Sequence, residues 1–401
     1  MGHDMKIISI LGSTGSIGVS SLNVISTLEG SYKIFGLSCN KNISLLYKQI
    51  KKYNPKYAVI TNQSSYKAFM KSHETDIGNT KILYGNEGLD VISSDKTITT
   101  IIAAIVGFSC IHPVIKAIDA DKTILIANKE ILVSAGDMII SRLKESEATI
   151  LPIDSEHNAL LQVILSSGLE YKINDDNYYN TKIKNLIITA SGGPFINHKP
   201  EDLKNVTSVE AIKHPTWNMG KKISIDSSTM MNKGLEIIEA KLLFNINIDN
   251  IKALIHRQSK VHAFIEFFDG TIISHMSNPD MKIPISYAIT YPERIYNSMS
   301  NDFLYDSFSF ESVPNNKFSC YWLARNVAEI GQNTGLILNA ANEISVEYFL
   351  EDKISYLDIP CVIEDILETS KIVEHDNIDA IIENDLEIRK LTKDLIKTKY
   401  L

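Results

Sequence analysis

Short apolar segments alternate with longer, helix-compatible segments from Lys6 to Leu151. Strands that alternate with helices form a parallel sheet covered by helices on both faces, because each parallel strand needs a crossover connection. The sequence therefore predicts a doubly wound α/β fold, in which ligands bind beyond the carboxyl ends of the strands. The predicted strands are Lys6–Leu11, Lys33–Leu37, Tyr57–Ile60, Thr100–Val106, Thr123–Ala127 and Thr149–Leu151.

A glycine-rich turn, Gly12–Gly18 (GSTGSIG), follows the first predicted strand. Its G-x-x-G-x-x-G spacing is a variant of the dinucleotide-binding pattern, in which glycines let the backbone approach a pyrophosphate at a helix N-terminus. A purely structural turn is the alternative. The second predicted strand ends in Cys39-Asn40-Lys41-Asn42, without the acid that would bind the ribose of NAD. We therefore favour NADP, with Lys41 near its 2′-phosphate; a solvated loop lysine is the alternative.

The composition limits the class of protein and its partners. A chain of 401 residues suggests about two or three domains. With 40 Lys and Arg against 48 Asp and Glu, the net charge of −8 argues against a nucleic-acid or anionic-membrane partner. No apolar stretch reaches the roughly 18 residues of a membrane span, and no signal peptide is evident, so we expect a cytoplasmic protein unless a targeting segment has been removed. The four cysteines form no C-x-x-C pair and are expected to be free thiols.

Two acids, Asp154 and Glu156, follow the predicted strand that ends at Leu151. Two carboxylates at one strand end suit a hard cation such as Mg²⁺ or Mn²⁺. The alternative is that this pair only caps a following helix.

A third acid lies in the segment Thr229–Phe244, whose apolar residues have helical spacing. Asn232 and Glu236 fall on another face of this helix, and Lys233 lies one turn before Glu236. The helix thus offers a carboxylate beside a cation and an amide. An exposed salt-bridged helix is the alternative. Gly234 costs the helix about 1 kcal/mol relative to Ala, which the close approach of another backbone or a ligand would explain.

Hydroxyl and backbone donors of the kind that hold a phosphate occur at Ser191-Gly192-Gly193 and at Ser227-Ser228. Lys233 would supply charge, and His214 would add a donor. Trp217 lies in a loop among glycine and proline, where an apolar side chain fits a lid that closes over a ligand and excludes water. A core position is the alternative for this tryptophan.

The ordered set of motifs along nearly the whole chain resembles the 1-deoxy-D-xylulose 5-phosphate reductoisomerase family. Each motif alone is moderate evidence, but their number and order together are specific. The motifs are Gly12–Gly18 (GSTGSIG), Ala127–Glu130 (ANKE), Pro152–Asn158 (PIDSEHN), Ser191–Phe195 (SGGPF), His214–Gly220 (HPTWNMG), Met230–Glu236 (MMNKGLE) and Leu338–Glu343 (LNAANE).

The resemblance implies NADPH- and divalent-metal-dependent isomerisation and reduction of 1-deoxy-D-xylulose 5-phosphate to 2-C-methyl-D-erythritol 4-phosphate, in non-mevalonate isoprenoid biosynthesis. It also implies a homodimer. With the chain's own patterning, it predicts a Rossmann-like NADPH domain at 1–153 and a central α/β (α+β) catalytic domain at 154–291, with a mobile lid around 191–221. A linker at 292–317 and a C-terminal helical domain at 318–401 follow.

The resemblance assigns site residues motif by motif. NADPH would be held by Thr14, Gly15, Ser16, Ile17, Asn40, Lys41, Asn42, Asn128, Glu130 and Gly220. Mg²⁺ or Mn²⁺ would be held by Asp154, Glu156 and Glu236. The sugar phosphate would be bound, and its reaction assisted, by Lys129, Ser155, Glu156, Ser191, His214, Ser227, Asn232, Lys233 and Glu236.

Four residues depart from the family pattern. Asn40 stands where Gly is frequent, Thr216 where Asn is common, Ser228 where Ala is usual, and Arg257 where Pro is usual. Asn40 puts the geometry of the cofactor loop in question, because Asn adopts left-handed conformations less freely than Gly. Two other functions remain as alternatives: a different NADP-linked enzyme on a related scaffold, and a non-enzymatic NADP-binding sensor.

Overall fold

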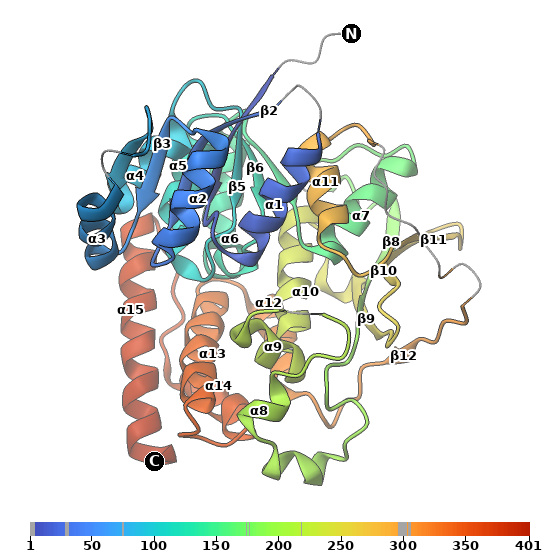
Figure 1. The fold of residues 1–401 in the computed structure, drawn as a ribbon. Helices are drawn as coiled ribbons and strands as arrows, with labels where there is room; N and C mark the ends of the chain where they lie inside the picture. The colour runs from blue at the N-terminus through green and yellow to red at the C-terminus, as the bar shows by residue number, and fades with distance from the viewer. Residues whose placement is uncertain are drawn as a thin grey trace. The chain divides into compact units, whose positions relative to one another are not determined.

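The computed structural model describes residues 5–28, 32–73, 76–173, 175, 177–217, 219–295, 303 and 306–401 (Figure 1). Asn218 of the predicted lid and part of the predicted linker lie outside these residues. The chain divides into two compact units. Unit 1 comprises Met1–Ile131, Ser141–Asn158 and Asp280–Ser298, and unit 2 comprises Leu132–Ile140, Ala159–Pro279 and Met299–Leu401. The predicted domain boundaries stay a prediction.

Unit 1 is built on a seven-stranded parallel sheet with strand order β4-β3-β2-β1-β5-β6-β7. The order reverses between β1 and β5, which is where doubly wound sheets bind ligands. The predicted α/β class is confirmed. The strands are β1 (Lys6–Leu11), β2 (Tyr32–Cys39), β3 (Tyr57–Ile60), β4 (Lys81–Tyr84), β5 (Thr100–Ala103), β6 (Thr123–Ile126) and β7 (Thr149–Pro152).

Helices connect these strands and bury their apolar faces on the sheet. They are α1 (Ser16–Thr27), α2 (Ile43–Tyr53), α3 (Gln63–His73), α4 (Gly85–Ser94) and α5 (Ile111–Ile118). Two more helices, α6 (Lys129–Lys144) between β6 and β7 and α7 (Ser155–Ser166) after β7, each include residues of both units. A segment from much later in the chain, α11 (Lys282–Thr290), lies beside α1 (Figure 1). Lys6 Nζ anchors this segment to β1 by donating hydrogen bonds to the carbonyl oxygens of Ile289 (2.9 Å) and Tyr291 (3.0 Å).

Unit 2 contains a five-stranded sheet with strand order β11-β10-β8-β9-β12. The β8–β9 pair is parallel and the other pairs are antiparallel. The two-residue strand β12 falls within the predicted linker and pairs with Leu254 and Ile255 of β9. The strands are β8 (Ile183–Ala190), β9 (Ile251–Ile255), β10 (Val261–Phe267), β11 (Ile272–Met276) and β12 (Glu311–Ser312).

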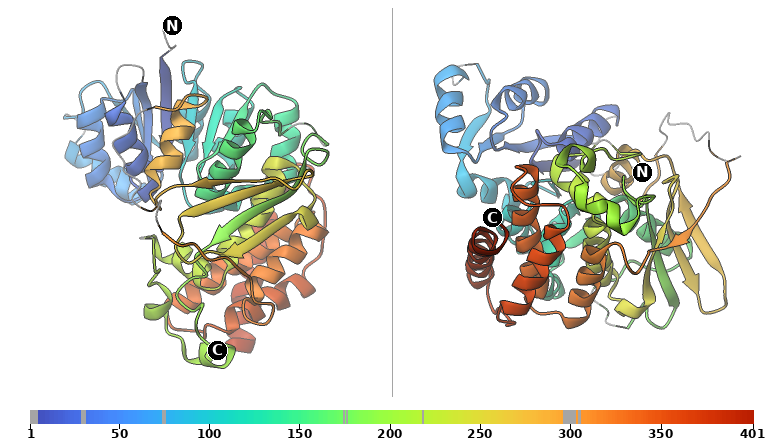
Figure 2. Two further views of the ribbon diagram at one scale, coloured as in Figure 1. Left: turned by 90° about the vertical axis from the view of Figure 1, so that its right-hand side faces the viewer. Right: turned by 90° about the horizontal axis from the view of Figure 1, so that it is seen from below.

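The last part of unit 2 is helical, as predicted. Helix α10 contacts both β9 and α12, so it links the sheet to the C-terminal helices, which Figure 2 shows in red and orange. Among the described residues, no helix is both long and apolar enough to cross a membrane. The helices are α8 (Ser208–Ala211), α9 (Lys221–Ser228), α10 (Met231–Phe244), α12 (Ser319–Ile330), α13 (Thr334–Leu350), α14 (Asp358–Thr369) and α15 (Ile378–Leu395).

The cysteines are free, as predicted: Cys39, Cys110 and Cys320 are buried and Cys361 is exposed. Burial raises the pKa of each of the three buried thiols to about 12, so they remain protonated. They are packing residues rather than nucleophiles.

Candidate active site

The glycine-rich turn connects β1 to α1 in unit 1. Gly12 has a φ of +85°, and a Cβ there would lie 2.8 Å from the carbonyl oxygen of Ala104. A Cβ on Gly18 would lie 2.4 Å from the carbonyl oxygen of Gly12, so helix and turn approach too closely for any side chain. Gly15 is the N-cap of α1, and no side-chain cap hydrogen bond forms there. The first-turn N–H groups therefore have the arrangement that binds phosphate oxygens.

The end of β2 accommodates the departure at Asn40. Asn40 Nδ2 donates a hydrogen bond to Thr61 Oγ1 (3.0 Å), and Asn40 is not among the described residues with positive φ. The position therefore does not require glycine. Asn42 caps α2, because its Oδ1 accepts from the Leu45 N–H at 3.2 Å. Lys41 is exposed between them.

Asn128 is buried and caps α6, since its Oδ1 accepts from the Ile131 N–H at 3.2 Å. Its Nδ2 donates to the carbonyl oxygens of Ile105 and Gly107 in the loop after β5. These bonds occupy both amide hydrogens. A contact with a cofactor through this side chain is therefore limited to the carbonyl oxygen.

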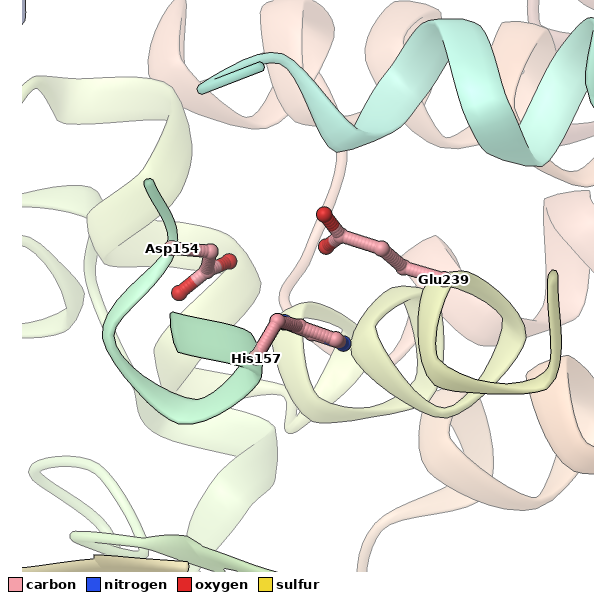
Figure 3. A group of neighbouring side chains, drawn as sticks. All are labelled: Asp154, His157 and Glu239. Atoms are coloured by element: carbon pink, nitrogen blue, oxygen red, sulfur yellow. The ribbon is translucent and has the colours of Figure 1, made fainter. Parts of the chain in front are cut away.

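The predicted acid pair follows β7. Asp154 directly precedes α7, and its carboxylate forms an ion pair with Lys129 Nζ at the start of α6. The two side chains are only 14% and 7% exposed, so each compensates the burial of the other. Ser155 Oγ donates to the Glu156 carboxylate. Figure 3 shows Asp154 and His157 at this turn.

The third acid lies on α10 in unit 2. Glu236 accepts a hydrogen bond from Asn232 Nδ2 and pairs with Lys233 Nζ, as the helical spacing predicts. Glu236 and Lys233 are 1% and 3% exposed, so the alternative of an exposed salt-bridged helix is wrong. Glu239 lies one turn further along α10 (Figure 3). It is also buried.

Gly234 is explained by packing, as predicted. A Cβ at this position would lie 2.4 Å from the Cβ of Ala324 on α12. The helix also begins later than predicted. Met230 adopts a left-handed conformation with φ of 60°, which separates α9 from α10, and α10 starts at Met231. Hydrophobic spacing alone cannot locate such a break.

Two of the predicted phosphate donors of unit 2, Ser191 and His214, contact each other. The Nδ1 atom of His214 lies 3.2 Å from the Thr216 N–H and 2.9 Å from the Trp217 N–H, so it accepts and carries no proton. Neutral His214 therefore carries its proton on Nε2, 3.0 Å from Ser191 Oγ. Ser191 Oγ also accepts from the Gly193 N–H at 3.2 Å. Both lone pairs of Ser191 are then used, so these two contacts leave its O–H hydrogen available for another acceptor.

Ser227 lies at the end of α9, next to the Ser191 loop. A Cβ on Gly193, which has a φ of +68°, would lie 2.6 Å from the Ser227 carbonyl oxygen. The side chain of Ser227 is half-buried. The departure at Ser228 is accommodated, because its buried hydroxyl donates to the Ile225 carbonyl at 2.7 Å.

The predicted lid precedes α9, whose N-cap is Gly220. Trp217 and Met219 are half-buried, so Trp217 is not a fully buried core residue. Thr216, another departure, uses its N–H to orient His214. Arg257 contacts both carboxylate oxygens of Glu311 on β12, at 3.1 and 3.4 Å, where a proline would make no such contact.

Sequence reasoning gave no role to Asp226, or to Asn342 within the Leu338–Glu343 motif. Asp226 on α9 is buried and pairs with Lys222, and Asn342 on α13 donates to it. The i,i+4 spacing of Lys222 and Asp226 signals the ion pair, whereas nothing local signals the contact with α13.

The parallel sheet and its glycine-rich turn place the chain in the dinucleotide-binding α/β class. Three family models match it. They are described as 1-deoxy-D-xylulose 5-phosphate reductoisomerase (residues 8–136), its C-terminal domain (150–244) and DXP reductoisomerase C-terminal domain (276–391).

Curated relatives match over the full length. The chain is 40% identical over 400 residues to the 1-deoxy-D-xylulose 5-phosphate reductoisomerase of Caldanaerobacter subterraneus subsp. tengcongensis, covering 99% of this chain and 100% of the relative. The Clostridium perfringens protein of the same name is 40% identical over 388 residues, with 96% and 98% covered.

Solved structures of reductoisomerases are also similar to this chain. A DOX-P reductoisomerase in complex with NADPH, fosmidomycin and magnesium has a TM-score of 0.91 and 38% identity, covering 98% of this chain and 100% of that one. The Zymomonas mobilis 1-deoxy-D-xylulose 5-phosphate reductoisomerase in complex with NADPH has a TM-score of 0.89 and 34% identity, with 98% and 100% covered. The chain therefore belongs to the 1-deoxy-D-xylulose 5-phosphate reductoisomerase family, and it is an oxidoreductase.

Proposed function

We propose that the chain converts 1-deoxy-D-xylulose 5-phosphate and NADPH to 2-C-methyl-D-erythritol 4-phosphate and NADP⁺ in non-mevalonate isoprenoid biosynthesis. The observation that carries this proposal is the 40% identity over 400 residues to an enzyme of that name. A non-enzymatic NADP sensor is disfavoured, because it has no need of buried carboxylates paired with lysines. A different NADP-linked enzyme is disfavoured because three models of this family match most of the chain.

Asp154, Glu156 and Glu236 are the proposed ligands of Mg²⁺ or Mn²⁺. The donor set fits, since each residue offers a carboxylate oxygen and these cations prefer oxygen ligands. The bound metal would polarise the substrate carbonyl and stabilise the developing enolate. Lys129 and Glu156 are the proposed residues that assist proton movement.

NADPH is proposed to bind at the turn after β1 and at the ends of the neighbouring strands. The uncapped first turn of α1 is suited to the pyrophosphate, and exposed Lys41 to the 2′-phosphate. The other proposed contacts come from Thr14, Gly15, Ser16, Ile17, Asn40, Asn42, Asn128, Glu130 and Gly220.

The substrate phosphate is proposed to bind in unit 2. The Ser191 hydroxyl donates to a phosphate oxygen, since its lone pairs are used by His214 and Gly193. Ser227, Asn232 and Lys233 add further donors, and Ser155 is also proposed to bind the substrate. The loop that carries Trp217 closes over the site and excludes water, which keeps the rearranged aldehyde in place for hydride transfer.

We also propose a homodimer. Strand β11 is an edge of the unit 2 sheet; its first residue, Ile272, is 56% exposed, and Phe268 in the turn before it is 61% exposed. An exposed apolar edge strand favours pairing with a second copy. The cytoplasmic location stays a prediction.

The decisive experiment measures NADPH oxidation by the purified chain with 1-deoxy-D-xylulose 5-phosphate and Mn²⁺, with and without a chelator. We expect turnover that the chelator abolishes and that Mn²⁺ or Mg²⁺ restores. Turnover unaffected by metal removal would favour a different NADP-linked enzyme. Tight NADPH binding without turnover of any sugar phosphate would favour a sensor.

A further inference from the structure

A buried polar contact joins α9 to the C-terminal helices. Asp226 on α9 is 1% exposed, and its carboxylate accepts a hydrogen bond from Asn342 Nδ2 of α13 at 2.9 Å. Lys222, one turn earlier on α9, forms an ion pair with Asp226 at 2.7 Å. A buried carboxylate with these two partners holds its helix in one orientation, because hydrogen bonds to an ionised group are both strong and directional.

A second polar contact fixes the adjacent backbone. Tyr356 Oη donates to the carbonyl oxygen of Ser228, the last residue of α9, at 2.7 Å. Burial raises the pKa of Tyr356 far above its usual range, so the phenol remains a donor. The Ser191 loop also packs against this turn, because Gly193 has no side chain and its backbone can therefore lie close to the Ser227 carbonyl oxygen. The last turn of α9 is therefore held from α13, from the loop before α14 and from the Ser191 loop.

The contact between Asp226 and Asn342 is poorly suited to a role in stability alone. Asn342 is fully buried, and its Oδ1 has no hydrogen-bond partner among the described residues. An unpartnered buried acceptor is destabilising, and apolar side chains of similar volume often stabilise a protein more than a buried charge does. A role that requires direction explains why polar groups occupy these positions.

We propose that Asp226, held by Asn342, is a positioning residue that directs the neighbouring Ser227 hydroxyl toward the substrate phosphate. This inference rests on the proposed function, in which Ser227 binds that phosphate. It gives the C-terminal helices a part in substrate binding, although none of their residues is proposed to contact the substrate.

The test compares Asn342→Leu with a matched control, Asn339→Leu. Both asparagines are on α13, fully buried, and have an unpartnered Oδ1, but Asn339 donates to Glu343 at 3.3 Å rather than to α9. We expect Asn342→Leu to raise the KM for 1-deoxy-D-xylulose 5-phosphate about tenfold, with the KM for NADPH changed less than about twofold. Asn339→Leu leaves both KM values near wild type. Equal effects of the two variants would overturn the proposal.

A double-mutant cycle with Ser227→Ala shows whether Asn342 acts through Ser227. If it does, adding Asn342→Leu to Ser227→Ala changes the substrate KM by less than about twofold. If the effects of the two substitutions on the substrate KM instead multiply in the double variant, Asn342 acts independently of Ser227. Tyr356→Phe enters the same cycle if Asn342→Leu does not fold.

Wild-type turnover separates failure of this inference from failure of the proposed function. If the wild type turns over no 1-deoxy-D-xylulose 5-phosphate, the proposed function fails. Titration with inorganic phosphate by calorimetry then tests the positioning role. Weaker phosphate binding in Asn342→Leu than in Asn339→Leu supports the role, and equal binding by the two variants refutes it.

Discussion

Replacing Gly234 by Ala tests the packing that positions the carboxylate helix α10. The new Cβ would lie 2.4 Å from the Cβ of Ala324 and 3.5 Å from the Tyr321 backbone. Carbon atoms in contact prefer about 3.5–4.0 Å, so the two helices must separate by roughly 1 Å. Ala324 has no flexible end that can turn away.

The expected net effect is a moderate loss of stability. Overpacking costs about 1–3 kcal/mol, and an approach of 2.4 Å, about 1 Å short of contact distance, places this substitution in the upper part of that range, at about 2–3 kcal/mol. The better helix propensity of Ala offsets about 1 kcal/mol. We therefore expect about 1–2 kcal/mol of destabilisation, or a fall in Tm of roughly 2–8 °C, measured by calorimetry. Adding Ala324→Gly removes the clashing methyl and should recover most of the loss. A single variant as stable as wild type would refute the argument that close packing requires Gly234.

Three further variants test the site and the fold. Glu236→Gln should lose most metal-dependent turnover and should keep NADPH binding, which is measured by fluorescence titration. Turnover near that of wild type would show that Glu236 is not a metal ligand. Lys41→Ala should weaken NADPH binding more than NADH binding. Equal weakening of the two would show that Lys41 does not contact the 2′-phosphate. Burial lowers the pKa of His256, so the folded chain loses stability as the pH falls through about 6.5, where the unfolded histidine gains its proton. Between about pH 7.5 and pH 5.5, the Tm of His256→Gln should therefore fall by less than the Tm of wild type. An unchanged pH dependence would show that His256 does not cause this loss of stability.

The sequence predicts the parallel strands well where they are apolar throughout, since such runs form buried strands. It misses β4 (Lys81–Tyr84), whose residues are exposed or half-buried at the sheet edge and whose apolar run, Ile82 to Tyr84, is only three residues long. It places the end of the fifth strand, Thr100–Ala103, three residues too late. Apolar character continues into the turn that Asn128 binds, so hydrophobicity alone does not mark where the strand ends.

In the candidate site, contacts between residues close in sequence can be predicted, whereas contacts between residues far apart in sequence cannot. The contact of Glu236 with Asn232 and Lys233 follows from helical spacing, because all three residues lie within two turns. Their burial does not follow from spacing, since it depends on other elements packing over α10. The contact of Asp226 with Asn342 joins residues 116 positions apart, and no local pattern encodes such a pair.

Each unit neutralises a carboxylate of the proposed metal set with its own lysine. Asp154 is paired with Lys129 in unit 1, and Glu236 with Lys233 in unit 2. Removing one partner of a buried ion pair costs about 3–5 kcal/mol, so these pairings let each unit fold without a metal. The same pairings compete with a divalent cation for the carboxylate oxygens. A cation bound by these carboxylates would therefore weaken their hold on the two ammonium groups, each of which could then bind an anionic group of the substrate or donate a proton.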